Sequence, residues 1–443
     1  MSILIRGGYV INPATSMEEN ADVYIEGNEV KEIGKNLKVE ATQVIDANGC
    51  YVMPGFIDLH VHFRDPGFEK KETIITGMHA AAHGGYTTVV CMPNTKPVVD
   101  NPDVVNYVKN KAQTEKCINV LQAGAITKGQ KGVELADIEG MYAAGIPAIS
   151  EDGKSVMNTE LYSEAMEIAA KLDIPVLAHC EDINLVNGGV MNKDEKAKEL
   201  GLPGISNTVE DIIVARDIML ANDTGAKLHL CHCSTKASVF MIQHAKMGGI
   251  KVTGEVCPHH FTLTSEDIKE YEPEVKNGIM IPNDTDADTN YKMNPPLRSK
   301  EDVEALKMGL RDNIMDVIST DHAPHTFEEK NTSMKNAPFG IVGLETAACL
   351  THDELVLKGY LTPMQMAEKM SYNPAKVIGI DKGDIQPGKI ADVVICDPKC
   401  TYTIDKNKFA SKGRNTPFHG RQVTGKVRCT ICDGNVVYQD EEA

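Results

Sequence analysis

The middle of the chain alternates between two kinds of segment, and this alternation limits the possible folds more than any other feature. Short apolar runs typical of β-strands are followed by stretches with helical periodicity, such as residues 72–83, 160–172, 209–221 and 300–310. The candidate strands end near His62, Met92, Gly124, Ser150, His179, His232, Glu255 and Asp321. Eight strand–helix repeats predict an α/β protein with a (β/α)8 TIM-type barrel, in which residues at the carboxyl ends of the strands face the active site.

The two ends of the chain differ from the middle and are similar to each other. Each consists of short β-like runs separated by Gly and Asn, for example residues 23–28 near the start and 391–395 near the end. We therefore expect one small β-sandwich domain built from both termini. The predicted domains are the β-sandwich parts, residues 1–53 and 384–443, and the barrel, residues 54–383.

The charge and the apolar runs exclude several classes of protein. A formal net charge of −18 argues against nonspecific nucleic-acid binding, which depends on neutralising phosphates, but allows a small anionic substrate if the local site is positive. No apolar run reaches the ~18 residues that a membrane helix needs. The first residues lack the basic start and the long apolar stretch of a signal peptide. We expect a cytoplasmic protein without a membrane partner.

The chain contains 12 cysteines, which we expect to be reduced thiols in the cytoplasm. Cys396, Cys400, Cys429 and Cys432 offer the donors of a structural zinc site. Each pair lies in or beside an alternating apolar run typical of a strand, so buried free thiols are the favoured interpretation.

One apolar run, residues 56–62, ends in two histidines separated by a single residue. Side chains alternate faces along a strand, so His60 and His62 project from the same face about 6–7 Å apart. Two imidazoles at this separation can bind one metal ion. The motif alone is equally compatible with a packed or solvated pair.

Further candidate metal ligands stand at the ends of other predicted strands: Asp152, His179, His232 and Asp321. Taken singly, each is compatible with a core histidine or with an aspartate in a turn or helix cap. Four histidines and two aspartates at one end of a barrel form a donor set suited to Zn2+ or a similar divalent ion. Six ligands exceed the needs of one tetrahedral zinc, and one bridging carboxylate would let them hold two metals.

Three other histidines near strand ends are left out of this set. His229 lies three residues before His232, so the pleat places it on the opposite face and a structural role is expected. His259 and His260 follow the seventh predicted strand, and we assign them to packing or to support of the ligands.

Several motifs resemble class I dihydroorotases of the amidohydrolase superfamily, and they span nearly the whole chain. They are residues 58–67, 92–95, 292–298, 320–325, 337–341 and 388–392. The resemblance implies two Zn2+ per subunit, bridged by Asp152 and a hydroxide. Hydantoinases, dihydropyrimidinases and allantoinases generally bridge their metals with a carboxylated lysine, whereas this chain has Ser-Glu-Asp-Gly at residues 150–153.

The resemblance also implies an activity and its residues. The reaction would be the reversible, zinc-dependent cyclisation of N-carbamoyl-L-aspartate to L-dihydroorotate with release of water, in de novo pyrimidine (UMP) biosynthesis. Asp321 would act as general base and then acid. The metal ligands would be His60, His62, Asp152, His179, His232 and Asp321, and the substrate would contact His62, Arg64, Asn94, Asn294, His325, Phe339 and Gly340. The expected assembly is a homodimer that can associate with aspartate transcarbamoylase.

Three features near the expected site carry separate predictions. Arg64 can hold a substrate carboxylate through a bidentate pair, and its alternative role is a surface ion pair with Asp65 or Glu69. Residues 326–337 are polar and free of glycine, which indicates a mobile rim loop that closes over substrate. Residues 278–291 form a stretch longer than is usual for the family, expected to alter the rim or the subunit contacts.

Two other functions stay open at this point. One is a different cyclic amidohydrolase, such as a hydantoinase or allantoinase, against which Asp152 and Arg64 argue. The other is a catalytically inactive dihydroorotase-like subunit that serves as a scaffold. Such relatives usually lose metal ligands, and all six are present here.

Overall fold

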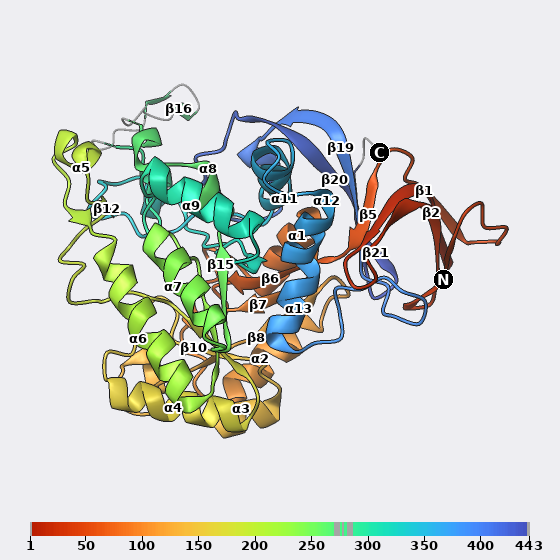
Figure 1. Ribbon diagram of the computed structural model, residues 1–443. Coiled ribbons are helices and arrows are strands. Elements are labelled where there is room, and N and C mark those ends of the chain that lie inside the picture. The colour runs from red at the N-terminus through yellow and green to blue at the C-terminus, as the bar shows by residue number, and fades with distance from the viewer. Residues whose placement is uncertain (1, 270–274, 277–278, 281–286, 441–443) are drawn as a thin grey trace.

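The computed structural model describes residues 2–269, 275–276, 279–280 and 287–440. Its larger part is a barrel of parallel strands, and its smaller part is a sheet that contains both chain ends (Figure 1). This architecture confirms the predicted fold class. Half of the stretch 278–291 lies outside the described residues, so the prediction made for it is not addressed by the structure.

The barrel strands follow one another in chain order, and each described neighbour pair is parallel. The closing contact joins the first and last strands, where His62 N donates to His322 O at 2.9 Å. The third strand is split into two short segments. The strands are β6 (Phe56–Val61), β7 (Tyr86–Cys91), β8 (Asn119–Gln122) with β9 (Gly124–Ala125), β10 (Ile149–Ser150), β11 (Pro175–Ala178), β14 (Lys227–Leu230), β15 (Val252–Val256) and β18 (Val317–Ile318).

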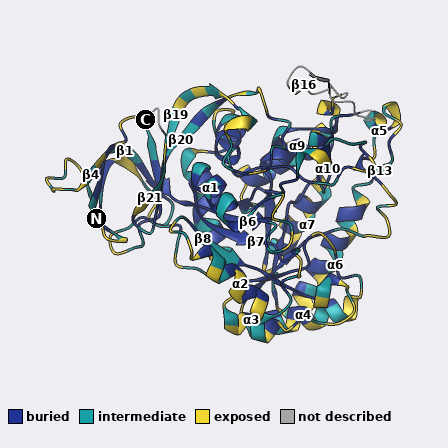
Figure 2. Cartoon of the chain, turned by 180° about the vertical axis from the view of Figure 1, so that it is seen from behind, coloured by how far each residue is buried: buried dark blue, intermediate teal, exposed yellow. Residues whose placement is uncertain are grey.

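Helices surround the barrel with an apolar face inward and exposed residues outward (Figure 2). Side-chain caps mark where they begin: Thr73 accepts from Thr76 N before the first, and Ser299 accepts from Asp302 N before the last. Such caps satisfy amide groups that have no partner in the first helical turn. The helices are α1 (Ile74–His83), α2 (Pro102–Ala112), α3 (Ile138–Ala144), α4 (Thr159–Lys171), α6 (Thr208–Thr224), α7 (Lys236–Met247) and α9 (Lys300–Arg311).

Shorter elements lie between these repeats and after the last strand. They are α5 (Glu195–Glu199), α8 (Pro258–Thr262), α10 (Phe327–Lys330), α11 (Ala347–Thr351), α12 (Pro363–Ala367), α13 (Asn373–Ile378), β12 (Met191–Asn192), β13 (Gly204–Ile205), β16 (Val275–Lys276) and β17 (Ile279–Met280). No helix in the described part of the chain is long and apolar enough to cross a membrane.

The second sheet joins the two ends of the chain, because β19 pairs antiparallel with β5 while β5 pairs with β1. Its order is β21-β20-β19-β5-β1-β2-β3, with β4 beside β1. Buried residues from both ends, such as Ile5 and Ile431, pack in one core. The strands are β1 (Ser2–Asn12), β2 (Met17–Glu26), β3 (Glu29–Gly34), β4 (Gln43–Asp46), β5 (Tyr51–Pro54), β19 (Val393–Thr403), β20 (Gln422–Cys432) and β21 (Asn435–Gln439).

Candidate metal centre and substrate site

The six predicted ligands meet at the carboxyl ends of the barrel strands, around the carboxylate of Asp152. Its Oδ1 lies 3.1 Å from His60 Nε2, 3.3 Å from His179 Nδ1 and 3.5 Å from His232 Nε2. Its Oδ2 lies 3.4 Å from His62 Nε2. All of these side chains are buried. One carboxylate therefore contacts four imidazoles from three different strand ends.

Asp321 completes one side of this cluster. Its Oδ1 is 3.0 Å from His62 Nε2 and 3.7 Å from His60 Nε2. On the other side, His179 Nδ1 and His232 Nε2 are 3.0 Å apart. The cluster thus has two halves, His60–His62–Asp321 and His179–His232, with Asp152 between them.

Three site residues adopt a left-handed backbone just beyond the strands. The φ angles are 61° at Arg64, 34° at His232 and 48° at Asp321. Such angles are uncommon for residues other than glycine, and they cluster at functional sites where the surrounding structure maintains them. Each turn redirects a side chain from the strand pleat toward the centre of the barrel mouth.

The outer ring nitrogens of three histidines face oxygen atoms. His60 Nδ1 donates to Glu255 Oε1 at 3.1 Å, His62 Nδ1 to Asn94 Oδ1 at 2.9 Å, and His179 Nε2 lies 3.3 Å from Glu181 Oε2. A proton on the outer nitrogen leaves the inner nitrogen with its lone pair toward the cluster, which is the arrangement of histidines that bind metals.

The inner atoms show that this donor set fits a cation. Among the described residues, His60 Nε2 is buried without a hydrogen-bond partner, although Asp152 Oδ1 is 3.1 Å away. Two groups of potential ligand atoms, His60–His62–Asp321 and His60–Asp152–His232, each lie within 4.8 Å of one another. Imidazole nitrogens and carboxylate oxygens are donors for zinc and similar divalent ions.

The two carboxyl groups of the cluster are held in the charged form. Burial raises the pKa of Asp152, but the neighbouring His60, His179 and His232 outweigh it and hold that pKa well below the usual value. Burial also opposes ionisation of Asp321, but the neighbouring His62 and His60 outweigh it and lower its pKa to about 2. Both carboxylates are therefore available as anionic ligands.

Arg64 lies beside the cluster with weak protein contacts. Its Nε is 3.4 Å from Pro324 O and its Nη2 is 3.4 Å from His325 Nε2. Within the described residues it forms no ion pair, whereas Asp65 pairs with Lys111 at 2.8 Å and Glu69 accepts from Gly67 N. The alternative of a surface ion pair with Asp65 or Glu69 does not occur, and the guanidinium is available to an anion.

Asn94 and Asn294 contact the ligand cluster in this structure rather than an open space. Asn94 Nδ2 donates to Asp152 Oδ2 at 3.3 Å, in addition to its bond with His62. Asn294 Nδ2 donates to Glu181 Oε1 at 2.9 Å. To contact the substrate as predicted, the side-chain amides of Asn94 and Asn294 would either release these protein partners or bind the substrate while keeping them.

His325 is oriented by two protein groups. Its Nε2 donates to Phe339 O at 2.8 Å, and its Nδ1 accepts from Lys71 Nζ at 3.3 Å. Burial and the nearby charges of Arg64, Lys330 and Lys71 hold its pKa well below the usual value. His325 is thus a neutral ring whose proton lies on Nε2.

The chain at Phe339 and Gly340 lies against His325. Gly340 has a φ of 147°, and a Cβ there would lie 2.7 Å from Ala323 O and 2.9 Å from His325 Cδ2. Only glycine brings the backbone this close. The Gly340 amide donates to Lys292 O at 2.9 Å.

Sequence reasoning missed two acids that support the cluster, the buried Glu255 and the half-buried Glu181. Glu255 bonds to His60, to His229 Nε2 at 3.1 Å and to the His232 amide at 3.2 Å. The hydrogen bond between His229 and Glu255 accounts for the structural role expected of His229. The signal available was position: Glu255 ends a predicted strand, and Glu181 lies two residues after His179.

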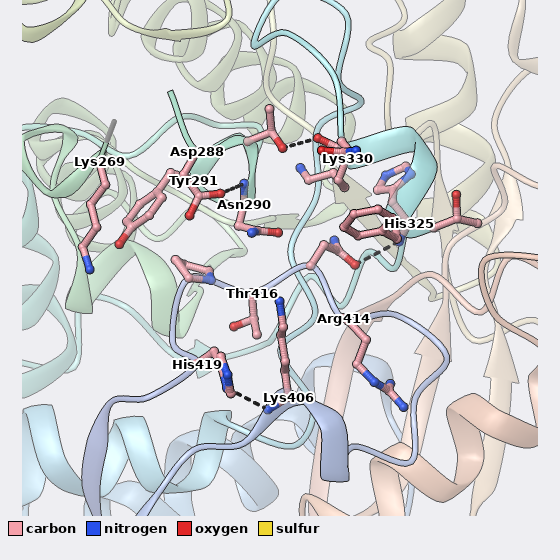
Figure 3. Close-up of a pocket in the computed structure, with 16 residues that line it drawn as sticks. Lys269, Asp288, Asn290, Tyr291, His325, Lys330, Lys406, Arg414, Thr416 and His419 are labelled. Atoms are coloured by element: carbon pink, nitrogen blue, oxygen red, sulfur yellow. Dashed lines mark hydrogen bonds between the residues drawn. The ribbon is translucent and has the colours of Figure 1, made fainter. Parts of the chain in front are cut away.

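A pocket of about 280 Å³ has His325 in its wall and is lined mainly by polar side chains (Figure 3). Lys269, Lys330, Lys406, Arg414 and His419 contribute to its wall, together with Asp288. Lys330 stands at the back of this pocket, where its carbonyl accepts a hydrogen bond from Thr289 Oγ1.

Comparison with known proteins places this geometry in context. Residues 49–238 match the family described as Dihydro-orotase-like. A dihydroorotase of Pelotomaculum thermopropionicum is 48% identical over 440 residues, covering 99% of each chain, and one of Clostridioides difficile is 48% identical, covering 98% of this chain and 99% of the other. Among solved structures, a D-hydantoinase of Thermus sp. is 27% identical with a TM-score of 0.81, covering 99% of this chain and 95% of the other.

Proposed function

The chain belongs to the dihydroorotase family, and on that premise we propose that the Asp152-centred cluster is the active site of a dihydroorotase. The reaction is the reversible closure of N-carbamoyl-L-aspartate to L-dihydroorotate with release of water, a step of pyrimidine synthesis. The observation that carries the proposal is one buried carboxylate, Asp152, between two sets of ligands, with the unpaired Arg64 beside them. The aspartate distinguishes the site from the lysine-bridged hydantoinases.

The proposed metal content is two Zn2+ per subunit. His60, His62 and Asp321 would hold one ion, His179 and His232 would hold the other, and Asp152 would serve both. Bound zinc supplies Lewis-acid chemistry, lowering the pKa of water toward about 7 and polarising a carbonyl oxygen. The unpartnered His60 Nε2 and the outward protons of His60 and His62 support this assignment.

Asp321 is the proposed proton-transfer group. In the hydrolytic direction it takes a proton from the attacking water and delivers that proton to the ring nitrogen that leaves, and synthesis reverses these steps. Its low pKa keeps the carboxylate deprotonated, and it lies 3.0 Å from His62 within the cluster. Its left-handed backbone turns the carboxylate away from the strand.

The remaining residues bind and orient the substrate. Arg64 would form the bidentate pair with the substrate carboxylate, because no protein carboxylate lies within 4.0 Å of it among the described residues. Asn94 and His325 would share that carboxylate, and Asn294 with the backbone at Phe339 and Gly340 would hold the ring. His325 and Gly340 are buried, whereas Arg64, Asn94, Asn294 and Phe339 are half-buried.

The proposal is tested with the purified protein by measuring dihydroorotate hydrolysis, carbamoyl-aspartate cyclisation and zinc content on the same sample. We expect turnover in both directions with two zinc ions per chain, loss on chelation and recovery on adding Zn2+. Faster turnover of hydantoin or allantoin would favour the other cyclic amidohydrolases. A metal-replete protein that turns over neither substrate would indicate the scaffold role. The homodimer and the association with aspartate transcarbamoylase stay predictions, to be checked by light scattering.

A further inference from the structure

Two lysines beside the substrate site are buried without a carboxylate partner. Lys292 is 2% exposed and Lys330 is 5% exposed, and neither has an acidic group within 4.0 Å among the described side chains. A buried ammonium group is costly unless its three donors find acceptors. The acceptors in this case are all backbone carbonyls.

Each ammonium group contacts three carbonyl oxygens. Lys292 Nζ donates to Met334 O at 2.7 Å, to Ala337 O at 2.6 Å and, more weakly, to Lys335 O at 3.3 Å. Lys330 Nζ donates to Pro338 O at 3.0 Å, to Gly340 O at 3.1 Å and to Lys292 O at 3.1 Å. Five of these six carbonyls belong to residues 334–340, which we call the substrate loop.

The contacts surround Phe339 from both sides. Lys330 binds the carbonyls before and after it, and Lys292 Nζ lies 4.4 Å from the centre of its ring, within cation–π range. The Phe339 carbonyl is left to accept from His325 Nε2. Lys292 O also accepts from the Gly340 amide, so both lysines fix the same two residues.

Burial of the two ammonium groups is unfavourable for their charged forms. Burial lowers the pKa of Lys292 to about 8 and that of Lys330 to about 7, and the charge of Lys292 contributes to the second shift. A methionine in either place would fill similar volume without that cost. The lysines are therefore difficult to explain as packing alone, because a charged donor set is useful only where several carbonyls must be held at fixed positions.

We propose that Lys292 and Lys330 are positioning residues of the substrate site. Their ammonium groups gather the carbonyls of the substrate loop much as a bound cation would, and so hold the Phe339 and Gly340 backbone where the substrate ring binds. This inference rests on the proposed function for the identity of the ligand. The ordering of the loop itself does not depend on it.

The test compares Lys292→Met and Lys330→Met with Lys369→Met as a matched control. Lys369 is also fully buried and donates to Met315 O and Asn313 Oδ1, both at 2.9 Å, but it contacts no residue of the substrate loop. We expect each substrate-loop variant to raise KM for dihydroorotate by about 10- to 100-fold with a smaller change in kcat. The control should lower Tm and leave KM unchanged.

Hydrogen exchange of the amides in residues 334–340 gives a readout without turnover. Exchange should become faster in both substrate-loop variants and stay unchanged in the control. Unchanged KM and exchange in the variants would overturn the inference. So would loss of folding by both variants beside a folded control, because the ammonium groups would then belong to the general core. Wild-type protein inactive on dihydroorotate would refute the proposed function alone, since the exchange result would still decide the role of the lysines.

Discussion

The metal cluster and the substrate rim are adjacent but are built by opposite means. The cluster consists of side chains at the ends of strands, and three of its histidines are oriented by another side chain, as Glu255 orients His60. The substrate rim consists of Arg64, His325 and the substrate loop, residues 334–340. Much of it is backbone of that loop, and the side chains of Lys292 and Lys330 bind its carbonyls. Strand ends supply rigid backbone positions, whereas a loop needs its carbonyls bound. Substitutions in the cluster should therefore act on metal and kcat, and those in the rim on KM.

Asp152→Ala should produce the largest effect in the cluster. Its carboxylate contacts four imidazoles, so its removal leaves both halves without their shared anion. We expect loss of bound zinc, most of all from the His179–His232 half, and loss of turnover. Metal analysis by mass spectrometry measures this directly. Retention of two zinc ions would refute the shared role.

Asp321→Asn should lower kcat by about 10²–10⁴-fold and change KM much less, as expected for removal of a general acid–base group. Zinc content must be measured first, since Asp321 is also a proposed ligand. A variant with full zinc and near-normal turnover would remove Asp321 from proton transfer.

Substitutions of Arg64 test how the rim binds the substrate carboxylate. Arg64→Lys and Arg64→Met should both lose about 10²-fold in kcat/KM on dihydroorotate, because a point charge cannot replace the planar fork. The loss should be small on dihydrouracil, which lacks the carboxylate. Equal losses on both substrates would mean that Arg64 stabilises the strand end rather than binding the substrate carboxylate.

Glu255→Gln should have a smaller effect, on metal affinity. The amide keeps the shape but weakens the acceptor for His60 Nδ1 and His229 Nε2, and supporting groups of this kind are worth about 10- to 100-fold in affinity. Competition with a zinc chelator measures the change. Unaltered affinity would show that strand geometry alone orients His60.

Asn415→Ala should have the smallest effect, on the rim. Asn415 precedes β20, and its Nδ2 donates to Ala323 O at 3.0 Å and to Gly340 O at 3.1 Å while its Oδ1 accepts from His325 N. Gly340 O keeps Lys330 as a second donor, so we expect only a several-fold rise in KM, consistent with about 1 kcal/mol for one neutral bond. A change in kcat without a change in KM would contradict the division between cluster and rim.

Local pattern was enough to predict the barrel, the β-rich ends and the position of each candidate ligand along the chain. The His60–His62 pair could be read from the pleat, because alternation of faces is set by covalent geometry within a few residues. The strand ends near His179 and His232 followed from short apolar runs. The motion expected of residues 326–337 stays a prediction, although the structure shows part of that segment bound by Lys292.

Alone, then, the sequence determined the repeat of strand and helix, the joining of both ends in one sheet, and the chemical types of the donors. Tertiary structure decided which atoms meet. His232 and Asp321 reach the cluster through left-handed turns beyond their strands, where the pleat no longer predicts direction. Glu255 and Lys330 find their partners only when the barrel closes, since contacts between distant residues depend on the packing of the whole chain and not on any local period.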